Sequence, residues 1–197
     1  MGELDDAISE SVEHARESKL NSKIAIFVAL TATFMAICNI KGGNIVQNMS
    51  KAQSKAVNSW AYYQSKSTKQ NLSENTVEIL GSQLLNTNNL EAKKDVEQKI
   101  AKFKEKIERY DTEKNEIKRE AEIQEKSYDD MNVFDDQFDM TEAILSIAIA
   151  MFGLSALTQK KQLFYFALTL SGLGFILGLT AFMNISLHSN LISNILG

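Results

Sequence analysis

The sequence contains no proline in 197 residues, and it has one cysteine and two histidines. Proline breaks helix interiors, so its absence is typical of a chain built from long, uninterrupted helices. The single Cys38 excludes a disulfide framework and any metal site with several cysteine ligands. His14 and His188 lie far apart and are isolated, which argues against a zinc site built on histidine.

The sequence also lacks the residue patterns of common catalytic and nucleic-acid-binding sites. Its net charge is −4, whereas a protein that binds nucleic acid usually carries a strong basic surplus. We find no Ser/His/Asp arrangement, paired carboxylates, metal-ligand cluster or glycine-rich phosphate loop with its lysine. We therefore expect a protein that is not an enzyme, has no cofactor and binds no nucleic acid.

Charge is missing from three stretches of the chain. Residues 1–23 carry six acids and three bases, residues 42–139 carry eighteen acids and fifteen bases, and residues 143–197 carry only Lys160 and Lys161. A helix needs ~20 apolar residues to span a bilayer, with ~17 as the lower limit, and lysines at its ends can reach the interface. The pattern predicts an all-α membrane protein with transmembrane helices over three ranges: 24–41, 140–159 and 162–184.

The first apolar stretch has an alternative interpretation as a secretory signal. The segment 1–23 before it is long and acidic, unlike the short basic segment that opens a signal peptide. We therefore favour a retained span. The acidic segment itself is weakly amphipathic as a helix, with its apolar side formed by Leu4, Ile8, Val12 and Ala15.

The second and third stretches must form an antiparallel hairpin, because only residues 159–162 join them. This short connection contains Lys160 and Lys161, and loops rich in lysine stay in the cytoplasm. The N-terminus would then be cytoplasmic, while residues 42–139 would lie on the other side of the membrane. The flanks of the first stretch carry three bases each and favour neither orientation.

The polar middle of the chain has a sustained heptad pattern from residue 96 to residue 131. Apolar side chains recur at alternating spacings of four and three, with charged residues between them, which predicts a coiled coil. A solvated single helix with one apolar stripe is the alternative. The eleven positions are Val96, Ile100, Phe103, Ile107, Tyr110, Lys114, Ile117, Ala121, Gln124, Tyr128 and Met131.

The heptad helix needs a partner, and residues 44–85 have a similar helical pattern. Residues 86–89, Asn-Thr-Asn-Asn, are the clearest turn between the two arms. Segment 42–139 is therefore predicted to be an antiparallel helical hairpin, a stalk ~60 Å long at 1.5 Å per residue. Gly42-Gly43 at its base forms either a kink or a loop, and exchange of arms between two chains would satisfy the same heptads.

One motif resembles a known family. The segment Trp60-Ala61-Tyr62-Tyr63-Gln64-Ser65-Lys66-Ser67 lies about twenty residues after the first apolar stretch and precedes the helical middle. In this setting the chain resembles, along nearly all of its length, a bacterial membrane family called domain of unknown function 4337. The resemblance implies a protein of the bacterial inner membrane, and it implies no activity and no catalytic residues.

The aromatic motif and the heptads supply the candidate interaction residues. Trp60, Tyr62 and Tyr63 form either a docking surface for a partner or packing contacts inside the stalk, and we favour packing because aromatic side chains dominate helix contacts. Lys66 would then be a solvated flank. The heptad residues Ile100, Phe103 and Ile107 are predicted to pack in the stalk.

Small residues suggest where the apolar helices approach one another. Gly174 and Gly178 form a GxxxG step, and Gly153 lies among small residues of the second stretch. Such faces serve close packing either within a subunit or between subunits. No acid or base lies deep in any apolar stretch, which argues against a role in ion-coupled transport.

Two segments beside the apolar stretches suggest further, weaker hypotheses. Six acids between Asp129 and Glu142 could bind a divalent cation, but we favour a solvated face or an orientation signal, since a calcium loop's glycine and spacing are missing. Residues 185–197 are amphipathic as a helix, which predicts an interfacial segment on the membrane.

Together these features favour a non-enzymatic, oligomeric membrane scaffold or assembly component. Its expected partners are the lipid bilayer, further copies of the chain and a protein that binds the stalk. A channel or conduit subunit is the alternative, with a stator-like protein as a variant, although polar candidates to line a pore are few.

Overall fold

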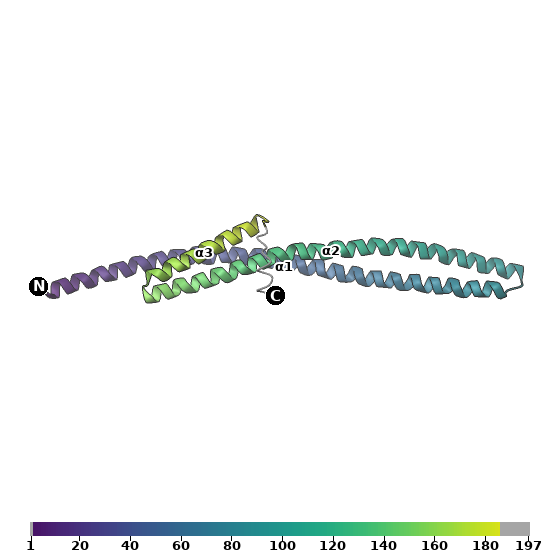
Figure 1. The fold of residues 1–197 in the computed structure, drawn as a ribbon, viewed down its shortest axis with the longest axis horizontal. Helices are drawn as coiled ribbons and strands as arrows, with labels where there is room; N and C mark the ends of the chain where they lie inside the picture. The colour runs from purple at the N-terminus through teal and green to yellow at the C-terminus, as the bar shows by residue number, and fades with distance from the viewer. Residues whose placement is uncertain (1, 186–197) are drawn as a thin grey trace. The chain divides into compact units, whose positions relative to one another are not determined.

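The computed structural model describes residues 2–185, with side chains from residue 16 onward and that of Val12. Three helices account for almost all of it: α1 (Gly2–Asn86), α2 (Leu90–Thr158) and α3 (Lys161–Phe182) (Figure 1). The expected all-helical fold is confirmed, and the described residues contain no strand. The predicted amphipathic tail lies, apart from Ile185, outside the described residues.

Each helix contains a segment long and apolar enough to cross a membrane. The most apolar 18-residue windows have mean hydropathies of 1.9 in α1, 1.8 in α2 and 1.8 in α3. At most 28% of each window is buried inside the structure, so most of these apolar side chains face outward. This outward exposure is unusual for a soluble protein and typical of a surface that lipid covers.

Helix α1 continues through the two glycines at positions 42 and 43. Both residues are helical, so the loop interpretation of Gly42-Gly43 is wrong. Gly42 is buried, and a Cβ atom built on it would lie 3.6 Å from the Cβ atom of Phe138 on α2. The glycine therefore allows α1 and α2 to approach closely at this point.

Short connections join the three helices. Asn89 precedes α2, and its side-chain oxygen accepts a hydrogen bond from the backbone N–H of Glu91 at 2.8 Å. This contact caps the first turn of α2, as asparagine commonly does. Between α2 and α3 only Gln159 and Lys160 are non-helical, and Gln159 has a φ of 55°.

The chain divides into two compact units. The three-helix unit comprises Met1–Gln47 and Asp130–Gly197, and the hairpin unit comprises Asn48–Asp129. In the three-helix unit, Phe27 of α1 stacks on Phe152 of α2 at 6.1 Å and meets Phe164 of α3 edge-on at 5.7 Å. These aromatic contacts join all three helices around one core.

In the hairpin unit, α1 and α2 lie side by side and run in opposite directions (Figure 1). Ten of the eleven heptad positions named above, all but Met131, lie in this unit, and each of them is buried or half-buried. Val96 and Ala121 are the most enclosed. On α1, Met49, Ala52 and Ala56 are buried. The heptad stripe of α2 therefore faces α1, which fits an antiparallel helix pair.

Candidate interaction sites

Trp60 and Tyr63 of the aromatic motif pack in the hairpin unit. The indole Nε1–H of Trp60 donates a hydrogen bond of 2.7 Å to Glu125 Oε1 on α2. The Trp60 and Tyr63 rings meet edge-on with centroids 5.6 Å apart, and both residues are half-buried. Tyr62 is 53% exposed. The motif thus brings Trp60 into contact with Glu125 and the ring centroid of Tyr63 to 5.9 Å from the ammonium group of Lys114, both on α2, and leaves Tyr62 at the surface.

Lys66 is not the solvated flank that the sequence suggested. Its side chain is only 12% exposed, and its ammonium group donates to Glu113 Oε2 on α2 at 2.5 Å. The same ammonium group lies 5.1 Å from the ring centroid of Tyr62 and 5.4 Å from that of Tyr110, within the range of cation–π attraction. The lysine thus joins the motif to α2.

The charge state of this pair is well defined. The hydrogen bond with Lys66 lowers the pKa of Glu113, and the hydrogen bond with Glu113 raises the pKa of Lys66. Both shifts favour the ionised forms, so the pair stays charged at neutral pH.

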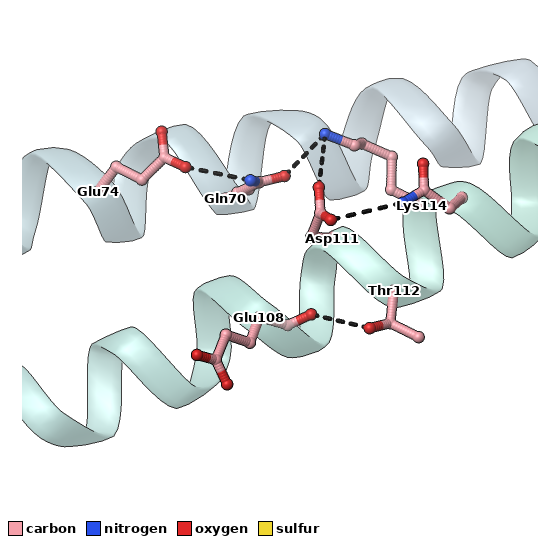
Figure 2. A network of polar contacts seen from close by, with 7 residues as sticks. Gln70, Glu74, Glu108, Asp111, Thr112 and Lys114 are labelled. Carbon is pink, nitrogen blue, oxygen red and sulfur yellow. Dashed lines mark hydrogen bonds and ion pairs between the residues drawn. The ribbon is translucent and has the colours of Figure 1, made fainter.

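Figure 2 shows a second polar cluster, which includes Lys114, the residue that follows Glu113 in the chain. Lys114 is a heptad residue, yet its ammonium group bonds to Gln70 Oε1 of α1 at 2.9 Å and to Asp111 Oδ1 at 3.4 Å. Gln70 in turn donates to Glu74 at 3.1 Å. Although Lys114 occupies a core position, its long side chain extends to the edge of the helix pair, where these polar groups bond to its ammonium group.

The predicted packing residues Ile100, Phe103 and Ile107 are half-buried on the face of α2 that contacts α1. Phe103 also has the ammonium group of Lys106 4.8 Å from its ring centroid. A surface groove beside it is lined by four bases together with Phe103 and Glu105; the bases are Lys99, Lys102, Lys106 and Arg109.

The candidate glycines fall into two groups. A Cβ atom on Gly174 would lie 2.5 Å from Leu145 Cδ2 of α2, and one on Gly178 would lie 2.8 Å from Phe34 Cε1 of α1. Both glycines are buried, so the GxxxG step packs α3 inside the subunit. Around Gly153 no atom lies within 4 Å of the Cβ position, so this glycine is open to a neighbour.

Polar side chains of the three-helix unit bond to one another across helices. The hydroxyls of Thr31 and Ser171 share a buried hydrogen bond of 2.9 Å between α1 and α3. Gln137 of α2 donates to Thr180 Oγ1 at 2.9 Å and to the Leu177 carbonyl at 3.1 Å. Sequence reasoning missed Ser171 and Gln137, because neither residue stands out until its partner on another helix is known.

The acidic run before the second apolar stretch shows no arrangement for a metal. Within the part of the chain that the structure describes, no three His, Cys, Asp or Glu side chains are grouped to hold an ion. Burial raises the pKa of Asp135, and the carboxylates of Asp139 and Asp136 raise it further. Among the described residues, Asp135 Oδ1 is buried and accepts no hydrogen bond. These neighbouring carboxylates therefore disfavour the ionised form of Asp135.

These contacts define a class: an all-helical protein whose two long helices pair as a hairpin and whose three apolar segments pack together. The chain belongs to the family described as "Domain of unknown function (DUF4337)", whose model matches residues 20–184. The family prediction made from the segment at Trp60 is therefore confirmed. No curated protein and no solved structure matches the chain.

Proposed function

We propose that this chain is an integral membrane protein with three transmembrane helices and an extramembrane coiled-coil stalk, and that it acts as a non-enzymatic, oligomeric scaffold. The apolar windows of α1, α2 and α3 supply the spans. The large exposed side chains Ile147, Leu173 and Ile176 are more than half exposed on α2 and α3 and would face lipid or a neighbouring subunit. The hairpin unit supplies the stalk.

The orientation follows from the connection between α2 and α3. Lys160 is non-helical there and Lys161 begins α3, so both lysines lie at the end of the helical hairpin. By the positive-inside tendency this end lies in the cytoplasm, together with the N-terminus, and the stalk lies on the opposite side. The bacterial inner membrane is the compartment we propose, with the stalk outside the cytoplasm.

One observation carries the scaffold role: Gly153 offers a close-approach surface on the outside of α2, whereas Gly174 and Gly178 are used within the subunit. Open small residues on lipid-facing helices allow another helix to pack closely. The hydrogen bonds of the hydroxyl groups in the apolar segments favour a scaffold over a conduit, because these hydroxyls already have partners within the chain. Thr31 and Ser171 satisfy each other, and the hydroxyls of Thr33 and Thr169 bond to carbonyls of their own helices.

The mass of the full chain in mild detergent tests this proposal. A closed oligomer that dissociates on Gly153→Leu, while the Gly43→Leu control keeps its mass, is the expected result; a Cβ atom on Gly43 likewise has nothing within 4 Å. A monomer at all concentrations would contradict the oligomeric scaffold. Ion flux through liposomes that depends on the protein would instead favour the conduit.

A further inference from the structure

The end of the hairpin unit around its turn, residues 70–111, carries opposite charges on its two flanks. The buried and half-buried heptad residues of α2, from Val96 to Tyr110, define the seam that faces α1. At 100° per residue, positions next to this seam divide into two flanks. On one flank four exposed bases recur at spacings of three and four and line the groove beside Phe103. This basic flank consists of Lys99, Lys102, Lys106 and Arg109. Its acids pair within the chain, Asp95 with Lys99 at 2.7 Å and Glu113 with Arg109 at 3.7 Å, and Glu105 also lines the groove.

The other flank is acidic. Gln70 bonds to both Glu74 and Lys114, and Lys114 bonds to Asp111, so these groups lie on the same side of the helix pair (Figure 2). Their helix positions place three further acids on this side. The acidic flank consists of Glu74, Glu78, Glu97, Glu108 and Asp111, with Lys94 and Lys104 as its bases.

The two flanks lie at the same level along the hairpin. The contacts of Lys66 with Glu113 and of Gln70 with Lys114 fix the register of α1 against α2. In this register Glu74 and Glu78 of α1 lie beside the stretch of α2 that carries Lys102, Lys106 and Arg109. Two copies standing in one membrane would therefore present a basic flank and an acidic flank at equal height.

We infer that the stalks of neighbouring copies associate side by side, with the basic flank of one copy against the acidic flank of the next. This inference rests on the proposed membrane scaffold. The contact is heterologous, so its repetition around an axis normal to the membrane forms a closed ring when the rotation from copy to copy divides a full turn. Single exposed ion pairs contribute little, but here several pairs act together between chains that the membrane holds at high effective concentration.

Charge reversal tests the contact in the full chain. Lys102→Glu with Lys106→Glu should convert the oligomer into monomers, and so should Glu74→Lys with Glu78→Lys. All four substitutions in one chain should restore the oligomeric mass. The matched control is Lys51→Glu with Lys55→Glu, two exposed lysines of α1 below both flanks, which should leave the mass unchanged. High salt should mimic the first two variants, since it screens exposed charges.

Crosslinking in the membrane tests the geometry. In a Cys38→Ser background, one chain carries Lys102→Cys and a differently tagged chain carries Glu78→Cys. Oxidation should link the two tags, whereas pairing the Lys102→Cys chain with a Gln53→Cys chain, which has its cysteine at a lower level, should not.

An oligomer that survives every reversal, or a Lys102→Cys chain that crosslinks to itself, overturns the inference and leaves the scaffold standing. A chain that is monomeric before any substitution overturns both. If reversal of Lys102 and Lys106 keeps the mass but abolishes binding to vesicles with anionic headgroups, the basic flank serves lipid and the inference is wrong.

Discussion

At the scale of single residues, two glycines of α3, Gly174 and Gly178, allow it to approach its neighbouring helices closely. Gly174 leaves no room for a Cβ atom, because Leu145 of α2 fills that space and is itself fully buried. The side chain of Leu145 cannot move aside without disturbing the core, since protein interiors are close-packed. The lack of a side chain at Gly174 is thus what allows α2 and α3 to lie this close.

We expect Gly174→Ala to destabilise the protein by about 1–3 kcal/mol, the usual cost of overpacking a core. Gly153→Ala is the matched control, because open space surrounds its Cβ position and alanine favours helix over glycine by up to about 1 kcal/mol. Thermal unfolding in detergent, followed by circular dichroism, measures both. Equal midpoints for the two variants would contradict the packing described for α3.

Asp135 holds a charge that its surroundings disfavour. Its pKa is raised from 3.8 by burial and by neighbouring carboxylates, so the folded state binds its proton more tightly than the unfolded state. Stability from this group is therefore present at low pH and is lost as pH rises through the raised pKa. Asp135→Asn should raise the unfolding midpoint at neutral pH and weaken the loss of stability that accompanies a rise in pH above 3.8.

The control for Asp135 is Asp130→Asn, an exposed neighbour on the same helix. It removes the same formal charge without a buried oxygen. If both variants change the pH profile equally, net charge and not burial accounts for the effect.

At the scale of helices, one buried hydrogen bond links α1 to α3. Thr31→Val would leave the Ser171 hydroxyl without its partner, and Ser171→Ala would do the same to Thr31. A double-mutant cycle in detergent should give a coupling of about 0.6 kcal/mol, with a ceiling near 1.7, as found for such bonds in membrane proteins. Additive effects of the two variants would show that the hydroxyls do not interact.

Much of the helix pattern could be predicted from the sequence, because a period of seven over five heptads has few structural solutions. Val96, Phe103 and Ala121 are buried or half-buried for this reason. The role of Lys66 could not be predicted in this way. Whether Lys66 is solvated or paired depends on Glu113, 47 residues further along the chain. The local sequence pattern around Lys66 contains no information about a partner so far away.

The same limit explains the glycines. The GxxxG step of Gly174 and Gly178 was recognisable, but its use within the subunit depends on where Leu145 and Phe34 lie. Likewise, the sequence allows either a kink or a loop at Gly42-Gly43, whereas both residues are helical and Gly42 packs against Phe138. Tertiary contacts thus override local preference at both places.

At the scale of the whole molecule, the proposed topology depends on two lysines. Lys160→Gln with Lys161→Gln removes the basic connection, so a mixture of orientations should replace a single one. Asn88→Cys in a Cys38→Ser background places a label at the stalk turn. In intact cells a reagent that cannot cross membranes should label this site fully in the parent and less in the lysine variant.

The control for topology is Lys118→Gln with Arg119→Gln, which removes two bases far from the apolar segments. Its labelling should match that of the parent. A turn that is protected from the reagent in the parent would contradict the proposed location of the stalk.

The hydrogen bond between Trp60 of α1 and Glu125 of α2 can be used to test whether the two paired arms belong to one chain or to two chains. Trp60 is the sole tryptophan, so all of the tryptophan emission comes from the side chain that makes this contact. Consider a mixture of Trp60→Phe chains and Glu125→Ala chains, refolded together; alanine removes the acceptor, which glutamine would keep. In closed hairpins no chain can form the contact, whereas exchanged arms complement each other and restore it, so the emission spectrum distinguishes self-contained subunits from domain-swapped ones.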